Sequence, residues 1–307
     1  MREFPWTILR GFFMGAADVV PGVSGGTIAL VLGIYERLIA SIRAGSLALG
    51  RLLRLDMSGA ITWLRRVEWT FIVPLLGGIL LAIVALAGIL EDQLLERPIQ
   101  LAALFLGFVA GSVVVAWQML RTRDIVRMVI LAGTALAVFV LLGLRGGTTE
   151  ETVGQLGEVG ILAFFVAGAV AICAMILPGI SGSFILVILG MYGPVLAVVN
   201  DRDFAMAAVF ALGAVVGLAL FSQFLYWALN HHHDTVIAAL IGLMLGSTRV
   251  LWPWPFGVNT TELGTPDEAV LQAIGFAVVG FAAVIGLSLL AKRVDRKVSD
   301  PAATSAD

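Results

Sequence analysis

The sequence predicts an all-α polytopic membrane protein with two inverted repeats, each a re-entrant or broken-helix hairpin followed by three transmembrane helices. Of its 307 residues, 60% are hydrophobic and 13% charged, and the mean hydropathy is +1.01, which leaves too little polar surface for a soluble globule. Charge-free stretches recur that reach about 20 residues, the length that crosses a bilayer core. They lack the alternation of barrel strands, so we expect helices. One helix-breaking motif also occurs twice.

The first repeat is expected over residues 1–150 and the second over residues 151–307. Each begins with a hairpin that returns to the side it left, at 4–40 and at 159–200. The six crossings expected are 69–90, 98–120, 125–145, 204–230, 235–252 and 269–291, with a short polar tail after the last. Because 159–200 is long enough for two full crossings, the sequence leaves open whether each hairpin is re-entrant or spans the membrane.

Residues 41–66 carry an Arg every few positions between apolar residues. This pattern is typical of a helix lying in the membrane interface, and a solvated linker fits it too. The early Arg2 and the apolar run after it resemble a signal peptide, but no small-x-small cleavage site precedes the first motif.

The distribution of positive charge orients the chain in the inner, cytoplasmic membrane. With the topology above, 15 of the 19 Lys and Arg residues fall on one side, which predicts that both termini are cytoplasmic. The net charge of −2 argues against nucleic-acid binding, and the lone Cys173 allows no internal disulfide.

The repeated motif reads DVVPGVSGGTIALVLGIY at 18–35 and MILPGISGSFILVILGMY at 175–192. A shift of 157 residues places Pro21 on Pro178. A later pair of segments with a different offset, 102–112 and 238–247, also resemble each other. Since three crossings follow each motif, the second repeat must be inverted relative to the first. This architecture is typical of secondary transporters with a midplane substrate site, although an old duplication kept for packing gives the same pattern.

Each motif predicts a broken helix with an anion site. Pro21 and Pro178 each stop a helix and the following Ser-Gly starts another, so backbone N–H groups are left to face a ligand. The candidate phosphate-binding residues are Gly22, Ser24, Gly25, Gly26 and Thr27 in the first copy, and Gly179, Ser181, Gly182 and Ser183 in the second. Ordinary capping or close helix packing would also account for these serines.

Ionisable residues near the first motif are candidates for proton or charge coupling. Asp18 lies in a segment that reads as membrane-embedded, where it would carry a proton or hold an arginine, and its counterpart is Met175. Glu36 and Arg37 follow the first half-helix and fit either a cytoplasmic mouth or a simple ion pair. Ser222 and Gln223 break an apolar crossing, either to bond a neighbouring helix or to line a path.

Enzyme signatures have no support elsewhere in the chain. GVSGG at 22–26 matches the nucleophile elbow G-x-S-x-G, but the chain offers no α/β sheet and no suitable His. The three histidines are the consecutive residues 231–233, which point in different directions on a helix, so we expect no metal site and no cofactor. Without a P-loop, an ion gradient or the substrate's own gradient must supply the energy.

Together the two motifs resemble the signatures of the polyprenyl-phosphate transporter family, long catalogued as a domain of unknown function, over about residues 7–292. The resemblance implies a flippase that returns undecaprenyl phosphate from the outer to the cytoplasmic leaflet for cell-wall peptidoglycan synthesis. It implies functional roles for the candidate residues above, although the second copy departs from the first at Ser183 and Phe184. A transporter of small soluble anions and a membrane phosphatase acting on the same lipid are the alternatives. The oligomeric state stays open, including a homo-oligomer.

Overall fold

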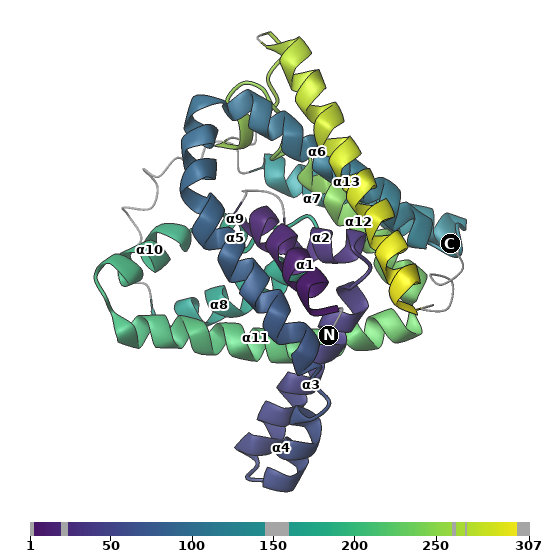
Figure 1. Cartoon of the computed structure of the whole chain (residues 1–307). Helices are drawn as coiled ribbons and strands as arrows, with labels where there is room; N and C mark the ends of the chain where they lie inside the picture. Colours follow the sequence, from purple (N-terminus) through teal and green to yellow (C-terminus); the bar gives the residue numbers. More distant parts are fainter. Residues whose placement is uncertain (1–2, 20–23, 145–159, 260–261, 268, 300–307) are drawn as a thin grey trace.

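The computed structural model describes residues 3–19, 24–144, 160–259, 262–267 and 269–299, and all regular secondary structure within these ranges is helical (Figure 1). The helices are α1 (Glu3–Asp18), α2 (Gly25–Val31), α3 (Tyr35–Leu53), α4 (Met57–Leu64), α5 (Trp69–Glu96), α6 (Pro98–Met119), α7 (Ile125–Gly143), α8 (Ile161–Ile176), α9 (Gly182–Ile188), α10 (Tyr192–Asn200), α11 (Phe204–His231), α12 (His233–Ser247), the 3-10 turn η2 (Gly257–Asn259) and α13 (Val270–Ser299). The predicted all-α class is therefore confirmed.

Five of these helices are long and apolar enough to cross a membrane. The spans are Trp69–Leu86, Pro98–Met119, Ile125–Gly143, Phe204–His231 and Val270–Val294, and each coincides with a predicted crossing. The sixth prediction, 235–252, corresponds to α12, which is apolar but ends at Ser247, short of a spanning length. The structure thus supports a multi-pass membrane protein.

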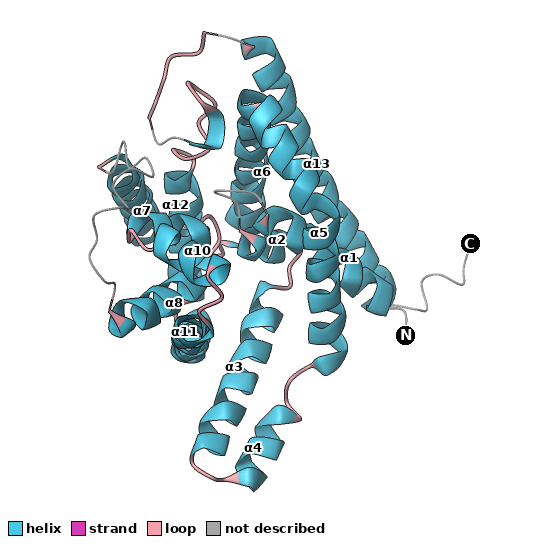
Figure 2. Cartoon of the chain, turned by 90° about the vertical axis from the view of Figure 1, so that its left-hand side faces the viewer, coloured by secondary structure: helices cyan, strands magenta, loops and turns pink. Residues whose placement is uncertain are grey.

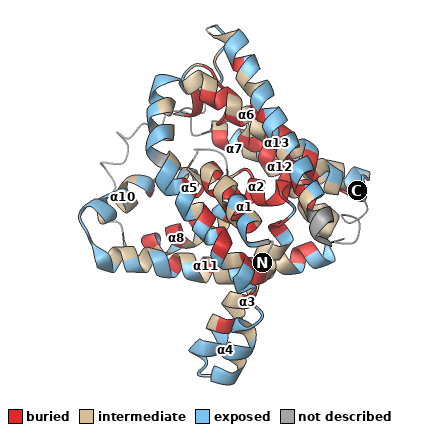
Figure 3. Ribbon diagram, in the orientation of Figure 1, coloured by how far each residue is buried: buried red, intermediate tan, exposed pale blue. Residues whose placement is uncertain are grey.

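The core is centred on the short helix α2, all of whose residues are buried. This helix contacts α1, α3, α6, α8 and α13 and lies in the middle of the molecule, where Figure 3 shows most of the buried residues. Leu30, Tyr35 and Ile39 belong to the same cluster of buried residues as Ile237 and Ile241 of α12. Helices from both halves of the chain therefore enclose the first half-helix and bury it.

Four helix pairs make the principal contacts, and glycines bring them close together. They are α1 with α5, α8 with α11, α6 with α13, and α7 with α12. A Cβ on Gly11 would overlap the carbonyl of Leu75 in α5, and a Cβ on Gly168 would overlap that of Phe210 in α11. In the other two pairs, Gly107 approaches the carbonyl of Ala277 and Gly242 that of Leu131. The backbones of these pairs are therefore in direct contact.

Helices α3 and α4 form a hairpin that extends away from the other helices (Figure 2). The boundary expected between a hairpin ending at 40 and an interfacial helix over 41–66 falls inside α3, because no helix breaker occurs there. The expected helix is instead two helices, separated where Leu55 adopts a φ of 57° and Asp56 caps α4 by accepting from Gly59 N–H. The pKa of Asp56 is lowered by hydrogen bonds from Gly59, Ser58 and Arg51.

Candidate substrate site

The start of α2 is tied to the end of α8 through Ser24. The Ser24 hydroxyl oxygen caps α2 by accepting from Gly26 N–H at 3.0 Å. The same oxygen lies 3.2 Å from the carbonyl oxygen of Met175 and 3.1 Å from that of Leu177, so its proton can be donated to either. The first motif therefore binds the backbone of the second directly.

Asp18, the last residue of α1, accepts a hydrogen bond from a second backbone N–H group at the start of α2. Its Oδ1 accepts from Gly25 N–H at 2.6 Å. A Cβ at position 25 would lie 2.5 Å from the carboxylate, so only glycine leaves room for this contact. The N–H groups of Gly25 and Gly26, two of the candidate anion donors, are thus already bonded to side chains of the first motif.

Thr27 and Tyr35 complete the connection between the motifs. Thr27 Oγ1 accepts from Gly179 N–H at 2.9 Å, and the Tyr35 hydroxyl donates to the carbonyl of Ile176 at 3.3 Å. Gly179 has a φ of +86°, which favours glycine, and a Cβ there would overlap Met244 of α12. The chain break after α8 is consequently fixed by hydroxyls of the first motif. Pro21 and Gly22 lie outside the described residues.

The second motif uses its hydroxyls differently. Ser181 precedes α9 but its side chain does not cap the helix; instead, its oxygen lies 2.7 Å from that of Ser183. Met175, which stands where the first motif has Asp18, packs its side chain against Gly182. Because a thioether is a poor acceptor, the start of α9 lacks the carboxylate contact that closes the start of α2.

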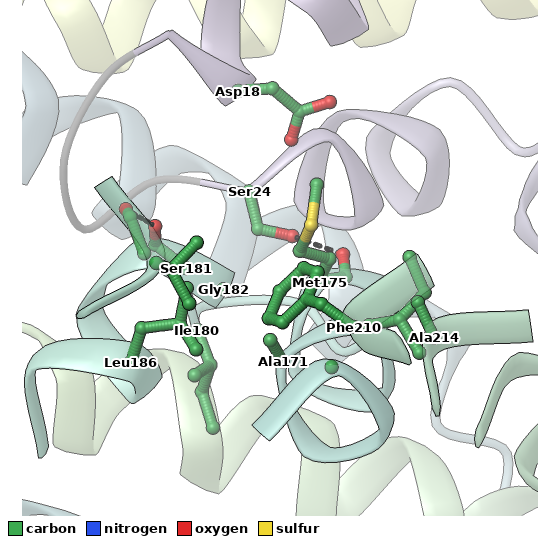
Figure 4. Close-up of a pocket in the computed structure, with 14 residues that line it drawn as sticks. Asp18, Ser24, Ala171, Met175, Ile180, Ser181, Gly182, Leu186, Phe210 and Ala214 are labelled. Atoms are coloured by element: carbon green, nitrogen blue, oxygen red, sulfur yellow. Dashed lines mark hydrogen bonds between the residues drawn. The ribbon is translucent and has the colours of Figure 1, made fainter. Parts of the chain in front are cut away.

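A cavity of about 320 Å³ lies between the two motifs (Figure 4). Asp18 and Ser24 face it from the first motif, and Met175, Ile180, Ser181, Gly182 and Ser183 from the second. Its remaining walls come from α8, α9, α10 and α11, and include Leu186, Phe210 and Ala214. The described residues that line it include no Lys or Arg, so an anion bound there would be held by hydroxyl and N–H donors without a salt bridge.

Glu36 and Arg37 do not line this cavity. Glu36 Oε1 lies 3.2 Å from His233 Nε2, and His233 Nδ1 in turn lies 3.0 Å from Asp234 Oδ1. Arg37 pairs with Glu68 at 2.7 Å and its guanidinium stacks 4.3 Å from the Phe71 ring centroid. These contacts join α3 to α12 and α5.

The other polar positions bond within their own helices. Ser222 and Gln223 both donate to the carbonyl of Ala219, and His231 stacks on Trp227. Sequence reasoning missed Tyr35 as a bonding residue and Phe210 as a wall of the cavity. The sequence did offer one signal for Phe210, the match of Gly168 to Gly11 between the repeats. A Cβ on Gly168 would overlap the carbonyl of Phe210, so this glycine lets α11 approach the cavity.

Comparison with known proteins identifies the family. Residues 14–265 match the family described as "VCA0040-like: Undecaprenyl phosphate translocase-like". The chain belongs to this translocase-like family. A polyprenyl-phosphate transporter of Vibrio cholerae serotype O1 is 40% identical over 251 residues, 81% of this chain and 77% of that protein. A polyprenyl-phosphate transporter of Staphylococcus aureus is 31% identical over 300 residues, 94% and 97% of the two chains. No solved structure matches the chain.

Membership of the translocase-like family decides whether the protein is a transporter or a membrane phosphatase, which the sequence left open. The family and both relatives carry the names of transporters, and the chain is a transporter rather than an enzyme. The G-x-S-x-G match at 22–26 is therefore not a nucleophile elbow. Its Ser24 instead holds the two broken helices together.

Proposed function

We propose that the protein moves a polyprenyl phosphate, undecaprenyl phosphate in particular, from the outer to the cytoplasmic leaflet, which recycles the lipid for cell-envelope synthesis. The observation that carries the proposal is the cavity of about 320 Å³ between the broken helices, with three serine hydroxyls and a carboxylate in its lining. The names of the relatives support the lipid as substrate. The phosphate would enter the cavity while the tail stays in the bilayer.

The second motif supplies the main phosphate contacts in this proposal. Ser181 and Ser183 bond to each other through their side chains, and both hydroxyls can rotate toward a phosphate that enters the cavity. The uncapped backbone of Gly182 lies beside them. Ser24 lines the cavity too, but its hydroxyl is bonded to Gly26 and to the end of α8, so it positions the chain together with Gly25, Thr27 and Gly179.

Asp18 couples transport to protons in this proposal. Its carboxylate lines the same cavity as Ser181, so a bound phosphate and an ionised Asp18 would repel each other where no basic side chain compensates. A proton taken up by Asp18 or by the phosphate removes this repulsion, and an ion gradient can then drive exchange. Glu36 and Arg37 hold α3 in place, since both are paired away from the cavity.

An inverted-repeat arrangement, with the domains divided near residue 150, is supported by the helix contacts. Gly11 and Gly168 occupy equivalent positions in the repeat, and each meets the first of the long helices that follow its own motif. Gly107 and Gly242 are also equivalent, and each meets the last long helix of the other half. Reciprocal contacts of this kind are what a two-fold relation between halves requires.

The proposed orientation places both termini in the cytoplasm. The start of α1 lies near the end of α13 in both views (Figures 1 and 2), which agrees with the charge asymmetry of the sequence. The phosphate would then be released on the side that carries most of the Arg and Lys residues.

The test uses purified protein in liposomes that contain undecaprenyl phosphate, with a membrane-impermeant phosphate-binding probe outside. We expect faster exposure of the inner-leaflet phosphate than in empty liposomes, and a loss of on the order of tenfold in Ser181→Ala plus Ser183→Ala. Ser112→Ala is the control, because Ser112 does not line the cavity and donates to Phe108 of its own helix. Equal rates with and without protein, or uptake of free phosphate instead, would overturn the proposal.

A further inference from the structure

A second cavity of about 150 Å³ adjoins the first, and the short helix α9 separates the two. Leu186 faces the first cavity, whereas Ile185 and Ile188 face the second. Ile180 and Ser181, at the start of α9, line both. A ligand can therefore place one group in each cavity, with the bond that joins the two groups beside Ser181.

The second cavity is suited to hydrocarbon. Its described lining is aliphatic apart from Gly179 and two serines, and one of these, Ser247, donates its hydroxyl to the carbonyl of Met244 at 2.9 Å. Leu141 of α7 also lines it and is 62% exposed, so the cavity reaches the apolar surface that α7 presents to the bilayer. Apolar cavities stay dry, and one of about 150 Å³ accepts benzene, which is similar in size to an isoprene unit.

We infer that this second cavity binds the isoprene unit next to the phosphate of a polyprenyl phosphate. The inference rests on the proposed function, because it places the phosphate beside Ser181 in the first cavity. The rest of the tail would leave past Leu141 into the bilayer. The two cavities together then distinguish a lipid phosphate from a free phosphate, which can use only the first.

The test measures binding of two probes, farnesyl phosphate and inorganic phosphate, to the full-length protein in detergent. Ile188→Phe and Leu142→Phe fill the second cavity from opposite walls, α9 and α7. We expect each to weaken farnesyl phosphate binding about tenfold, the loss for about two methylene groups that remain unburied, and to leave inorganic phosphate binding unchanged. Retained inorganic phosphate binding also reports that the variant is folded.

Leu189→Phe is the matched control, since Leu189 follows α9, is 42% exposed and lines neither cavity. Unchanged farnesyl phosphate affinity in both cavity variants, or equal losses for the two probes, would overturn the inference. Ser181→Ala tests the proposed function separately, because it should weaken both probes. If it weakens neither, the phosphate site itself is wrong, whatever the cavity variants do.

Discussion

Replacement of Thr27 by Val tests whether the first motif holds the second in place. Valine has nearly the same shape but no hydroxyl, so Gly179 N–H loses its acceptor at 2.9 Å. Thr27 is 1% exposed and Gly179 is buried, which keeps water from replacing the lost bond. An unsatisfied buried donor costs about 1–3 kcal/mol, and about 1.4 kcal/mol changes an equilibrium constant tenfold.

The assay is the free energy of unfolding in mixed micelles, measured alongside transport in liposomes. We expect Thr27→Val to lose about 1–3 kcal/mol and to transport more slowly, whereas Thr27→Ser keeps the bond and retains transport. Thr62→Val is the control, because Thr62 is exposed and donates only to Ser58 of its own helix. Equal stability of Thr27→Val and the unaltered protein would show that this bond does not hold the chain break.

Three further outcomes are expected. Asp18→Asn keeps an oxygen for Gly25 N–H but cannot ionise, so the transport rate should lose its dependence on pH, while Glu36→Gln keeps it; an unaltered pH profile in Asp18→Asn would exclude the coupling role. Gly168→Val should cost about 1–3 kcal/mol because its side chain meets Phe210, and Gly133→Val, which points into open space, should cost far less in the same unfolding assay. Because folding lowers the pKa of Asp56, its carboxylate stabilises the folded protein above the ordinary pKa of 3.8, and this stabilisation is lost as the pH falls through the pKa of the folded state. The difference in thermal stability between the protein and Asp56→Asn should therefore vanish below that pH, and a difference that persists would contradict this.

Much of the fold was predictable because a bilayer leaves few choices. Apolar segments long enough to span must be helices, and five of the six predicted crossings are helices long and apolar enough to span in the structure. The helix ends were less predictable. The division of 35–64 into α3 and α4 depends on the left-handed Leu55 and the Asp56 cap, which a regular spacing of Arg residues does not reveal.

The partners of the candidate site residues were not predictable from their spacing. Tyr35 and Tyr192 are equivalent in the repeat, yet Tyr35 is 1% exposed and bonds to Ile176, whereas Tyr192 is 38% exposed. Likewise, the sequence offers Ser24 and Ser181 as equal ligands, and only the structure assigns Ser24 to the end of α8. Hydrogen-bond partners depend on which helices meet, and this is decided by contacts far apart in the chain.

The difference between the motifs restricts how the protein can change state. If the two halves exchanged roles, the second motif would have to hold the first as Thr27 holds Gly179. The residue equivalent to Thr27 is Phe184, which has no hydroxyl, and the residue equivalent to Asp18 is Met175, which cannot accept as a carboxylate does. The reverse bonds therefore cannot form. Two conformations related by such an exchange would be held by different interactions and differ in stability, so Thr27→Val should favour one of them rather than weaken both equally.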